Sequence, residues 1–99
     1  GVRILTGTDV PNPHVVEGFS LHEELQDLVE HCGMTPAEVL HASTRRAAEY
    51  HGEGAVDGTV AVGGKADLVL VDGDPLTDIR ATRGVHAVLT GRALLRKAA

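Results

Sequence analysis

The chain has 99 residues and only 2% aromatic residues, so we expect one modest core built from Val, Leu, Ile and Ala side chains. The formal net charge is −5, and no Lys/Arg cluster lies beside aromatic residues, which excludes a nucleic-acid-binding surface. No apolar run is long enough to span a bilayer, and a single cysteine excludes an internal disulfide, so we expect a cytoplasmic protein without a membrane partner.

Residues 3–14, "RILTGTDVPNPH", begin as a strand-like run that ends at Asp9. A carboxylate after a strand is most often a turn former. At the C-terminal end of a barrel strand, however, it points into a site where it binds a metal or moves protons. The residue types alone leave both interpretations open. Because the chain opens inside this strand-like run without an initiating Met, we expect it to be a piece of a longer protein.

The next segment, "SLHEELQDLVEHCG", predicts an amphipathic helix over residues 20–32. Ser20 and Glu23 have the spacing of a capping box, and Gly33 suits the left-handed position after the helix. Cys32 falls on the apolar face, so we expect a buried, inert thiol. The other residues of that face are Leu21, Leu25, Leu28 and Val29.

A second helical segment follows over residues 35–52. Thr35 is the predicted N-cap, with Pro36 at the first helical position and Glu38 completing a capping box. Gly52 is the predicted stop. The Ser43-Thr44 pair is a candidate break into two short helices.

The composition changes after Gly52, where glycines become frequent and a second region begins. Residues 66–71 predict a strand, and residues 72–75, "DGDP", its turn. Residues 84–96 predict two short strands joined about Thr90-Gly91 as a hairpin. We therefore divide the chain into residues 1–52 and 53–99.

Six histidines invite a metal site, but none are paired as H-x-H or H-x-x-x-H. His14 lies in the loop directly after Asp9, and His22 lies in the first turn of the helix that follows. These two are candidates to line a substrate pocket, although histidines in such places are more often ordinary surface or partly buried residues.

Two segments carry a family resemblance. "GTDVPNPHVVEGFSLHEELQDLVEHCGMTPAEVLHAST" followed by "GTVAVGGKADLVLVDGDPLTDI" resembles the C-terminal part of the metal-dependent amidohydrolase superfamily, in its imidazolonepropionase-like and prolidase-like branch. The chain departs from the family's tail motif in one turn, where Val62 replaces Pro, Gly64 takes the Lys position and Lys65 is shifted by one.

The resemblance implies an α/β fold: the last strand and C-terminal helices of a (β/α)8 TIM barrel, followed by strands of a small composite β-sandwich. By resemblance, Asp9 ends the eighth barrel strand as metal ligand and general acid/base. His14, Phe19 and His22 would lie on the substrate side. The implied cofactor is one or two divalent metal ions, zinc foremost, and the implied reaction is hydrolysis of a C–N bond in a small amide or cyclic amide.

The family's H-x-H, its bridging lysine or glutamate and its two later histidines have no counterpart in the 99 residues. Since a zinc site needs three or four ligands, we expect the chain alone to be inactive. The alternative to an enzyme segment is a non-catalytic product, or a subunit that associates with a chain carrying the remaining ligands. Its partner would be the remainder of the barrel or a homo-oligomer. A self-contained acidic α+β binding domain is a third interpretation.

Overall fold

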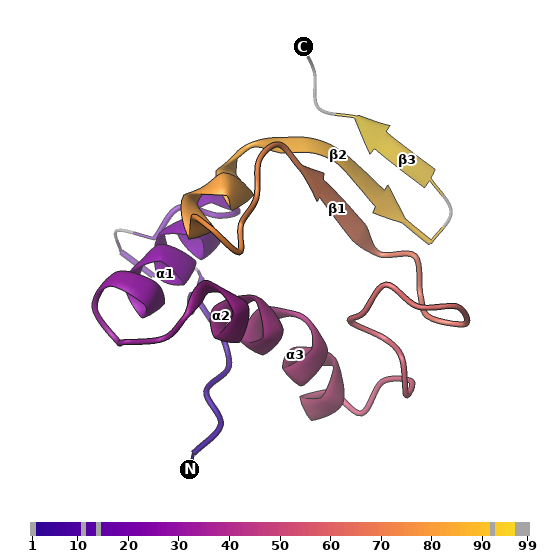
Figure 1. The fold of residues 1–99 in the computed structure, drawn as a ribbon, viewed down its shortest axis with the longest axis horizontal. Coiled ribbons are helices and arrows are strands. Elements are labelled where there is room, and N and C mark those ends of the chain that lie inside the picture. The colour runs from indigo at the N-terminus through magenta and orange to yellow at the C-terminus, as the bar shows by residue number, and fades with distance from the viewer. Residues whose placement is uncertain (1, 11, 14, 92, 97–99) are drawn as a thin grey trace.

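The structure, a computed structural model, describes residues 2–10, 12–13, 15–91 and 93–96. Three helices occupy the first half of the chain and a small sheet the second, with a 3-10 turn lying between the two layers (Figure 1). No helix among the described residues has both the length and the apolar character needed to cross a membrane. The elements are α1 (Phe19–Glu30), α2 (Pro36–Ser43), α3 (Arg45–Tyr50), β1 (Leu68–Val71), η1 (Ile79–Arg83), β2 (Val85–Thr90) and β3 (Ala93–Arg96).

Helix α1 begins one residue earlier than predicted, so the Ser20 capping box is wrong. Its N-cap is Gly18, at φ 77, and no side chain caps the helix. The Ser20 hydroxyl instead accepts the backbone N–H of Val16 at 2.6 Å, which closes the preceding loop onto the first turn. Glycine at this position allows a positive φ that a Ser N-cap would not adopt. Gly33 has φ 73, as its predicted place after the helix requires.

The capping box of α2 is confirmed. The Thr35 hydroxyl accepts the Glu38 backbone N–H at 3.2 Å, and the Glu38 carboxylate accepts the Thr35 N–H, with Pro36 in the first turn. The predicted break is also confirmed, since α2 ends at Ser43 and α3 starts after Thr44. Both hydroxyls donate to carbonyls one turn earlier, at 2.6 and 2.7 Å, an arrangement that bends helices.

The core joins the helices to η1. Leu25, Val39 and Ile79 are buried together, and Val39 is fully inaccessible. Ile79 comes from the second region of the sequence, so this core crosses the predicted boundary after residue 52. The buried-thiol prediction for Cys32 is wrong: α1 ends at Glu30, and Cys32 lies exposed in the turn that follows.

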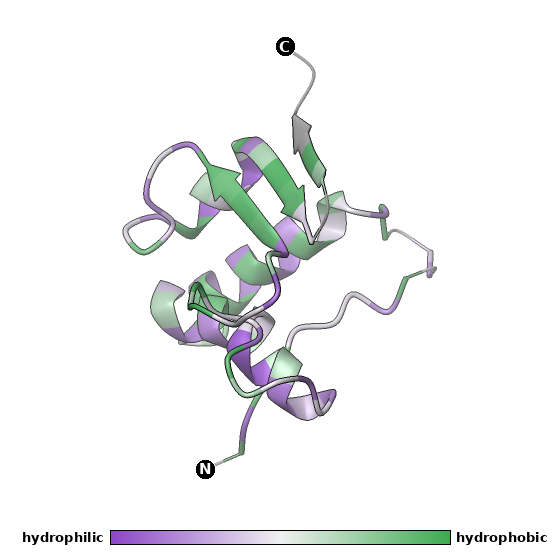
Figure 2. Cartoon of the chain, turned by 90° about the vertical axis from the view of Figure 1, so that its right-hand side faces the viewer, coloured by the Kyte–Doolittle hydropathy of each residue, from purple (hydrophilic) through white to green (hydrophobic). Residues whose placement is uncertain are grey.

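The sheet is antiparallel, in the order β1-β2-β3. The predicted strand at 66–71 forms as Leu68–Val71, and the predicted hairpin about Thr90-Gly91 is confirmed by the Thr90↔Ala93 pairing. The carboxylate of Asp67, just before β1, accepts the Gly91 N–H at 3.0 Å and so fixes the hairpin turn against the sheet. The strands are largely hydrophobic along their length (Figure 2).

The strand predicted to end at Asp9 is absent, because residues 2–9 carry no strand hydrogen bonds. A strand exists only with a neighbour to pair with, and β1–β3 pair with one another instead. Side chains hold the segment to the helices: the Gly7 N–H donates to Glu24 Oε2 at 2.8 Å, and Arg3 lies 3.5 Å from Glu49. The segment therefore follows the helical layer without joining the sheet.

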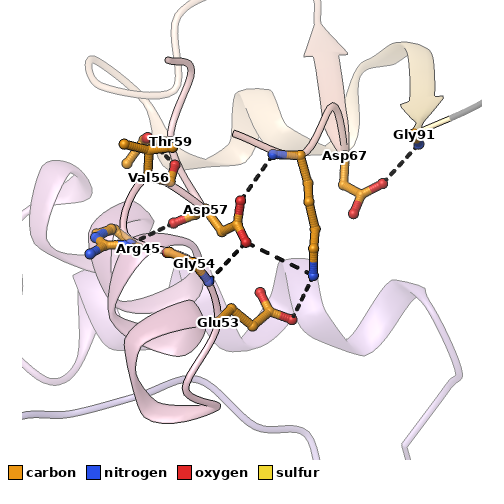
Figure 3. A network of polar contacts seen from close by, with 9 residues as sticks. Arg45, Glu53, Gly54, Val56, Asp57, Thr59, Asp67 and Gly91 are labelled. Atoms are coloured by element: carbon orange, nitrogen blue, oxygen red, sulfur yellow. Dashed lines mark hydrogen bonds and ion pairs between the residues drawn. The ribbon is translucent and has the colours of Figure 1, made fainter. Parts of the chain in front are cut away.

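Asp57 organises the loop between α3 and β1 (Figure 3). It is buried, and its carboxylate accepts the N–H groups of Lys65 at 2.9 Å and Gly54 at 3.0 Å. The Lys65 ammonium lies 3.9 Å away, and the Arg45 guanidinium donates to the Asp57 carbonyl at 2.8 Å. The Lys65 N–H bond is the foremost cause that lowers the pKa of Asp57, and burial opposes it. The carboxylate thus ties the loop to the approach to β1, and the backbone carbonyl of the same residue ties the loop to Arg45 of α3.

Candidate active-site segment

Asp9 stands at the end of the segment that precedes the loop into α1. Its φ is 58, the one positive value among the non-glycine residues that the structure describes. A positive φ costs a residue with a Cβ about 1 kcal/mol, and Asp and Asn tolerate it better than most. The Asp9 side chain is exposed. The chain thus turns sharply at Asp9 and presents its carboxylate to solvent.

Asn12 holds Asp9 in this conformation. Its side-chain Nδ2 donates to the Asp9 backbone carbonyl and to Asp9 Oδ2, both at 2.6 Å. The backbone carbonyl of Asn12 in turn accepts the Val15 N–H at 3.1 Å. The sequence interpretation overlooked Asn12, although an Asp followed by Asn three residues later is a spacing at which side chains close turns.

The two candidate histidines differ in what the structure says of them. His14 lies outside the described residues. His22, on α1, is half-buried against η1, with Nδ1 3.0 Å from the Thr82 hydroxyl. The same hydroxyl lies 3.1 Å from the Ile79 carbonyl, so it links His22 to the backbone of η1. These contacts give His22 a packing role and leave Nε2 as its ring atom for a further hydrogen bond.

Phe19, the third residue expected on the substrate side, forms part of the same α1–η1 contact. The Phe19 and His22 rings lie 6.4 Å apart between centroids. The Arg83 guanidinium stacks 5.2 Å from the centre of the Phe19 ring and donates to Gln26 at 2.6 Å. A cation over an aromatic face contributes about 0.5–1 kcal/mol at such exposed sites, so Phe19 helps to hold η1 on α1.

Among the described residues of this segment, Asp9 is the candidate ligand for a divalent metal ion. The exposed Asp9 carboxylate is an oxygen donor of the type that divalent cations accept. Within the described ranges, no group of three or more His, Cys, Asp or Glu side chains is placed to hold a metal ion. Among the described residues, the exposed Asp9 carboxylate thus has the chemistry of a single metal ligand.

Known proteins match nearly the whole chain. The model of the amidohydrolase family matches residues 1–91. The imidazolonepropionase of Thermoplasma volcanium is 33% identical over 92 residues, which cover 89% of this chain and 21% of that protein.

Solved structures give a similar result. A candidate prolidase from Bifidobacterium longum aligns with a TM-score of 0.68 and 37% identity, covering 74% of this chain and 18% of that one. An uncharacterized protein aligns with a TM-score of 0.64 and 31% identity, covering 79% of this chain and 20% of its own. The chain spans about a fifth of the length of these relatives. With residues 1–91 matched, the chain belongs to the amidohydrolase family.

Proposed function

We propose that this chain is the C-terminal portion of a metal-dependent hydrolase that cleaves a C–N bond, of the amide or cyclic-amide kind, in a small molecule. The observation that carries the proposal is Asp9, an exposed carboxylate at the end of the "GTD" sequence in a segment that the family model matches. The matched relatives, an imidazolonepropionase and a candidate prolidase, support a hydrolase.

In the full-length protein, we propose that residues 3–9 become the last strand of a (β/α)8 barrel by pairing with strands outside this chain. Residues 53–99 would contribute to a small sandwich domain, with the boundary after residue 52. The absence of a strand in residues 2–9 agrees with this view, since a barrel strand needs neighbours on both sides. Its C-terminal end, where barrel enzymes place their chemistry, would present Asp9.

The mechanism assigns Asp9 two tasks. As a ligand it would help to hold a divalent metal ion, zinc in our proposal, in a site of one or two ions. The metal would supply Lewis acidity toward water and the scissile carbonyl. As a base, its carboxylate takes a proton from the attacking water and then delivers that proton to the leaving nitrogen. His22 Nε2 is the atom that we propose as a donor or acceptor toward substrate, and His14 is proposed to lie on the same side.

The test is Asp9→Asn in the full-length protein, assayed for hydrolysis across a panel of small amides and cyclic amides. Asn tolerates the positive φ of this position, so the melting temperature should stay within about 2 °C of the parent. The loss of the proton acceptor should reduce turnover by about 10²- to 10⁴-fold. Turnover within a few-fold of the parent, at full metal content, would refute the assignment of Asp9.

Apolar exposure favours one other role, that of a subunit which associates with a chain carrying the remaining ligands. Val2 is 93% exposed, Val60 88% and Val62 fully exposed. Such side chains favour burial against a partner. Co-expression of the 99 residues with the preceding part of the barrel as a separate chain tests this role. Recovery of a stable complex that hydrolyses amides supports it, and failure of the two chains to co-purify opposes it.

A further inference from the structure

We propose that Asn12 is a positioning residue for the reaction, which fixes the direction of the Asp9 carboxylate. The inference rests on the proposed function, because it gives Asn12 no role unless Asp9 is the reacting group. It concerns a residue that neither the family match nor the sequence interpretation singles out.

The side-chain amide of Asn12 engages Asp9 at two places. Asn12 Nδ2 lies 2.6 Å from the Asp9 carbonyl oxygen and 2.6 Å from Asp9 Oδ2. One bond fixes the backbone and the other fixes the side chain. The two bonds together couple the positive φ of Asp9 to the direction in which its carboxylate points.

The backbone of Asn12 is itself held by a hydrogen bond. Its carbonyl accepts the Val15 N–H at 3.1 Å, which closes a turn over the following residues. The loop then joins α1 through the bond from the Val16 N–H to the Ser20 hydroxyl at 2.6 Å. The orientation of the carboxylate is therefore linked, through the loop, to the first turn of α1.

The bond from Asn12 distinguishes the two oxygens of the Asp9 carboxylate. Because Oδ2 accepts from Asn12, we assign Oδ1 of Asp9 as the atom that meets the reacting groups. A neutral amide suits this task, since it donates without neutralising the carboxylate. An aspartate at position 12 has nearly the same shape but replaces the donor with a second negative charge beside Asp9.

The experiment compares Asn12→Ala and Asn12→Asp in the full-length protein with the parent, with Asp9→Asn and with Glu17→Gln. Glu17 is an exposed carboxylate of the same loop and serves as the matched control. We expect both Asn12 variants to lose about 10- to 100-fold in kcat, while KM changes by less than about 3-fold, as for partners that orient a reacting carboxylate. Bound metal per chain should fall more for Asn12→Ala than for Asn12→Asp, because the added negative charge of Asp attracts a cation. Glu17→Gln should leave kcat, KM and bound metal unchanged.

The outcomes separate the inference from the proposed function. If Asp9→Asn is inactive but both Asn12 variants keep kcat within about 2-fold of the parent, the positioning role is overturned and the proposed function stands. A loss of activity that follows only a loss of folded protein, measured by circular dichroism, also overturns the positioning role. If Asp9→Asn remains active, the proposed function itself fails.

Discussion

Among the glycines that the structure describes, Gly58 has the least room for a side chain. Its φ is 76, and a Cβ added there would lie 2.7 Å from the Thr44 carbonyl oxygen and 2.9 Å from Arg45 Cα. Both are backbone atoms at the junction of α2 and α3, so they move only if the helices move. The positive φ costs alanine about 1 kcal/mol, and overpacking adds about 1–3 kcal/mol. We therefore expect Gly58→Ala to lower the free energy of unfolding by about 2–4 kcal/mol.

Gly52→Ala is the matched control, because Gly52 has nearly the same φ, 72, and a Cβ there would meet nothing within 4 Å. We expect it to lower the free energy of unfolding by only about 1 kcal/mol. Urea unfolding followed by far-ultraviolet circular dichroism at 25 °C measures both variants. Their difference isolates the contact of Gly58 with the helix junction. Equal destabilisation of the two variants, within about 0.5 kcal/mol, would refute this account of the junction.

Three further predictions concern the core, the acid dependence and the thiol. Val39→Ala removes two fully buried methyl groups and should lower the free energy of unfolding by about 2 kcal/mol; a loss below about 0.5 kcal/mol in urea titrations would contradict the burial. Backbone N–H bonds lower the pKa of Asp57 and the Arg80 side chain lowers that of Asp78. The two ionised carboxylates therefore contribute their full stabilisation to the folded state above the unfolded-chain pKa of about 4. This contribution is lost as the pH falls below that value and the carboxylates become protonated. Asp57→Asn should therefore flatten the fall in melting temperature between about pH 5 and 2, and an unchanged slope would count against the network. Exposed Cys32 should react with a thiol reagent in the native chain at nearly the unfolded rate, and strong protection would show that it is covered.

Local signals predicted the helices and turns well, because the groups that decide them lie within four residues of one another. The Thr35 capping box forms as its spacing predicts, and Gly33 and Gly52 both adopt the positive φ expected after a helix. The hairpin about Thr90-Gly91 also follows from its own residues. The prediction was wrong at Ser20, where two nearby signals compete: Gly18, two residues earlier, caps the helix, and the Ser20 hydroxyl accepts from the preceding loop.

Local sequence patterns could not predict the contacts between residues that lie far apart in the sequence. Cys32 shares the helical period of Leu25, but the helix stops before it, so the periodicity no longer applies. The central role of Asp57 depends on Lys65 and Arg45 arriving from both sides of a glycine-rich loop. Nothing in the spacing of the three residues predicts that convergence, since the loop conformation decides it.

The candidate site shows the same division between local and distant causes. The turn at Asp9 is local: Asn12, three residues on, supplies both of the hydrogen bonds that hold it. This turn forms although residues 2–9 have no strand hydrogen bonds. The conformation of the proposed reacting carboxylate is therefore determined by its own loop and does not require residues 2–9 to pair as a strand. Under the proposed function, strand partners and metal ligands from outside these residues would therefore meet a carboxylate that is already oriented.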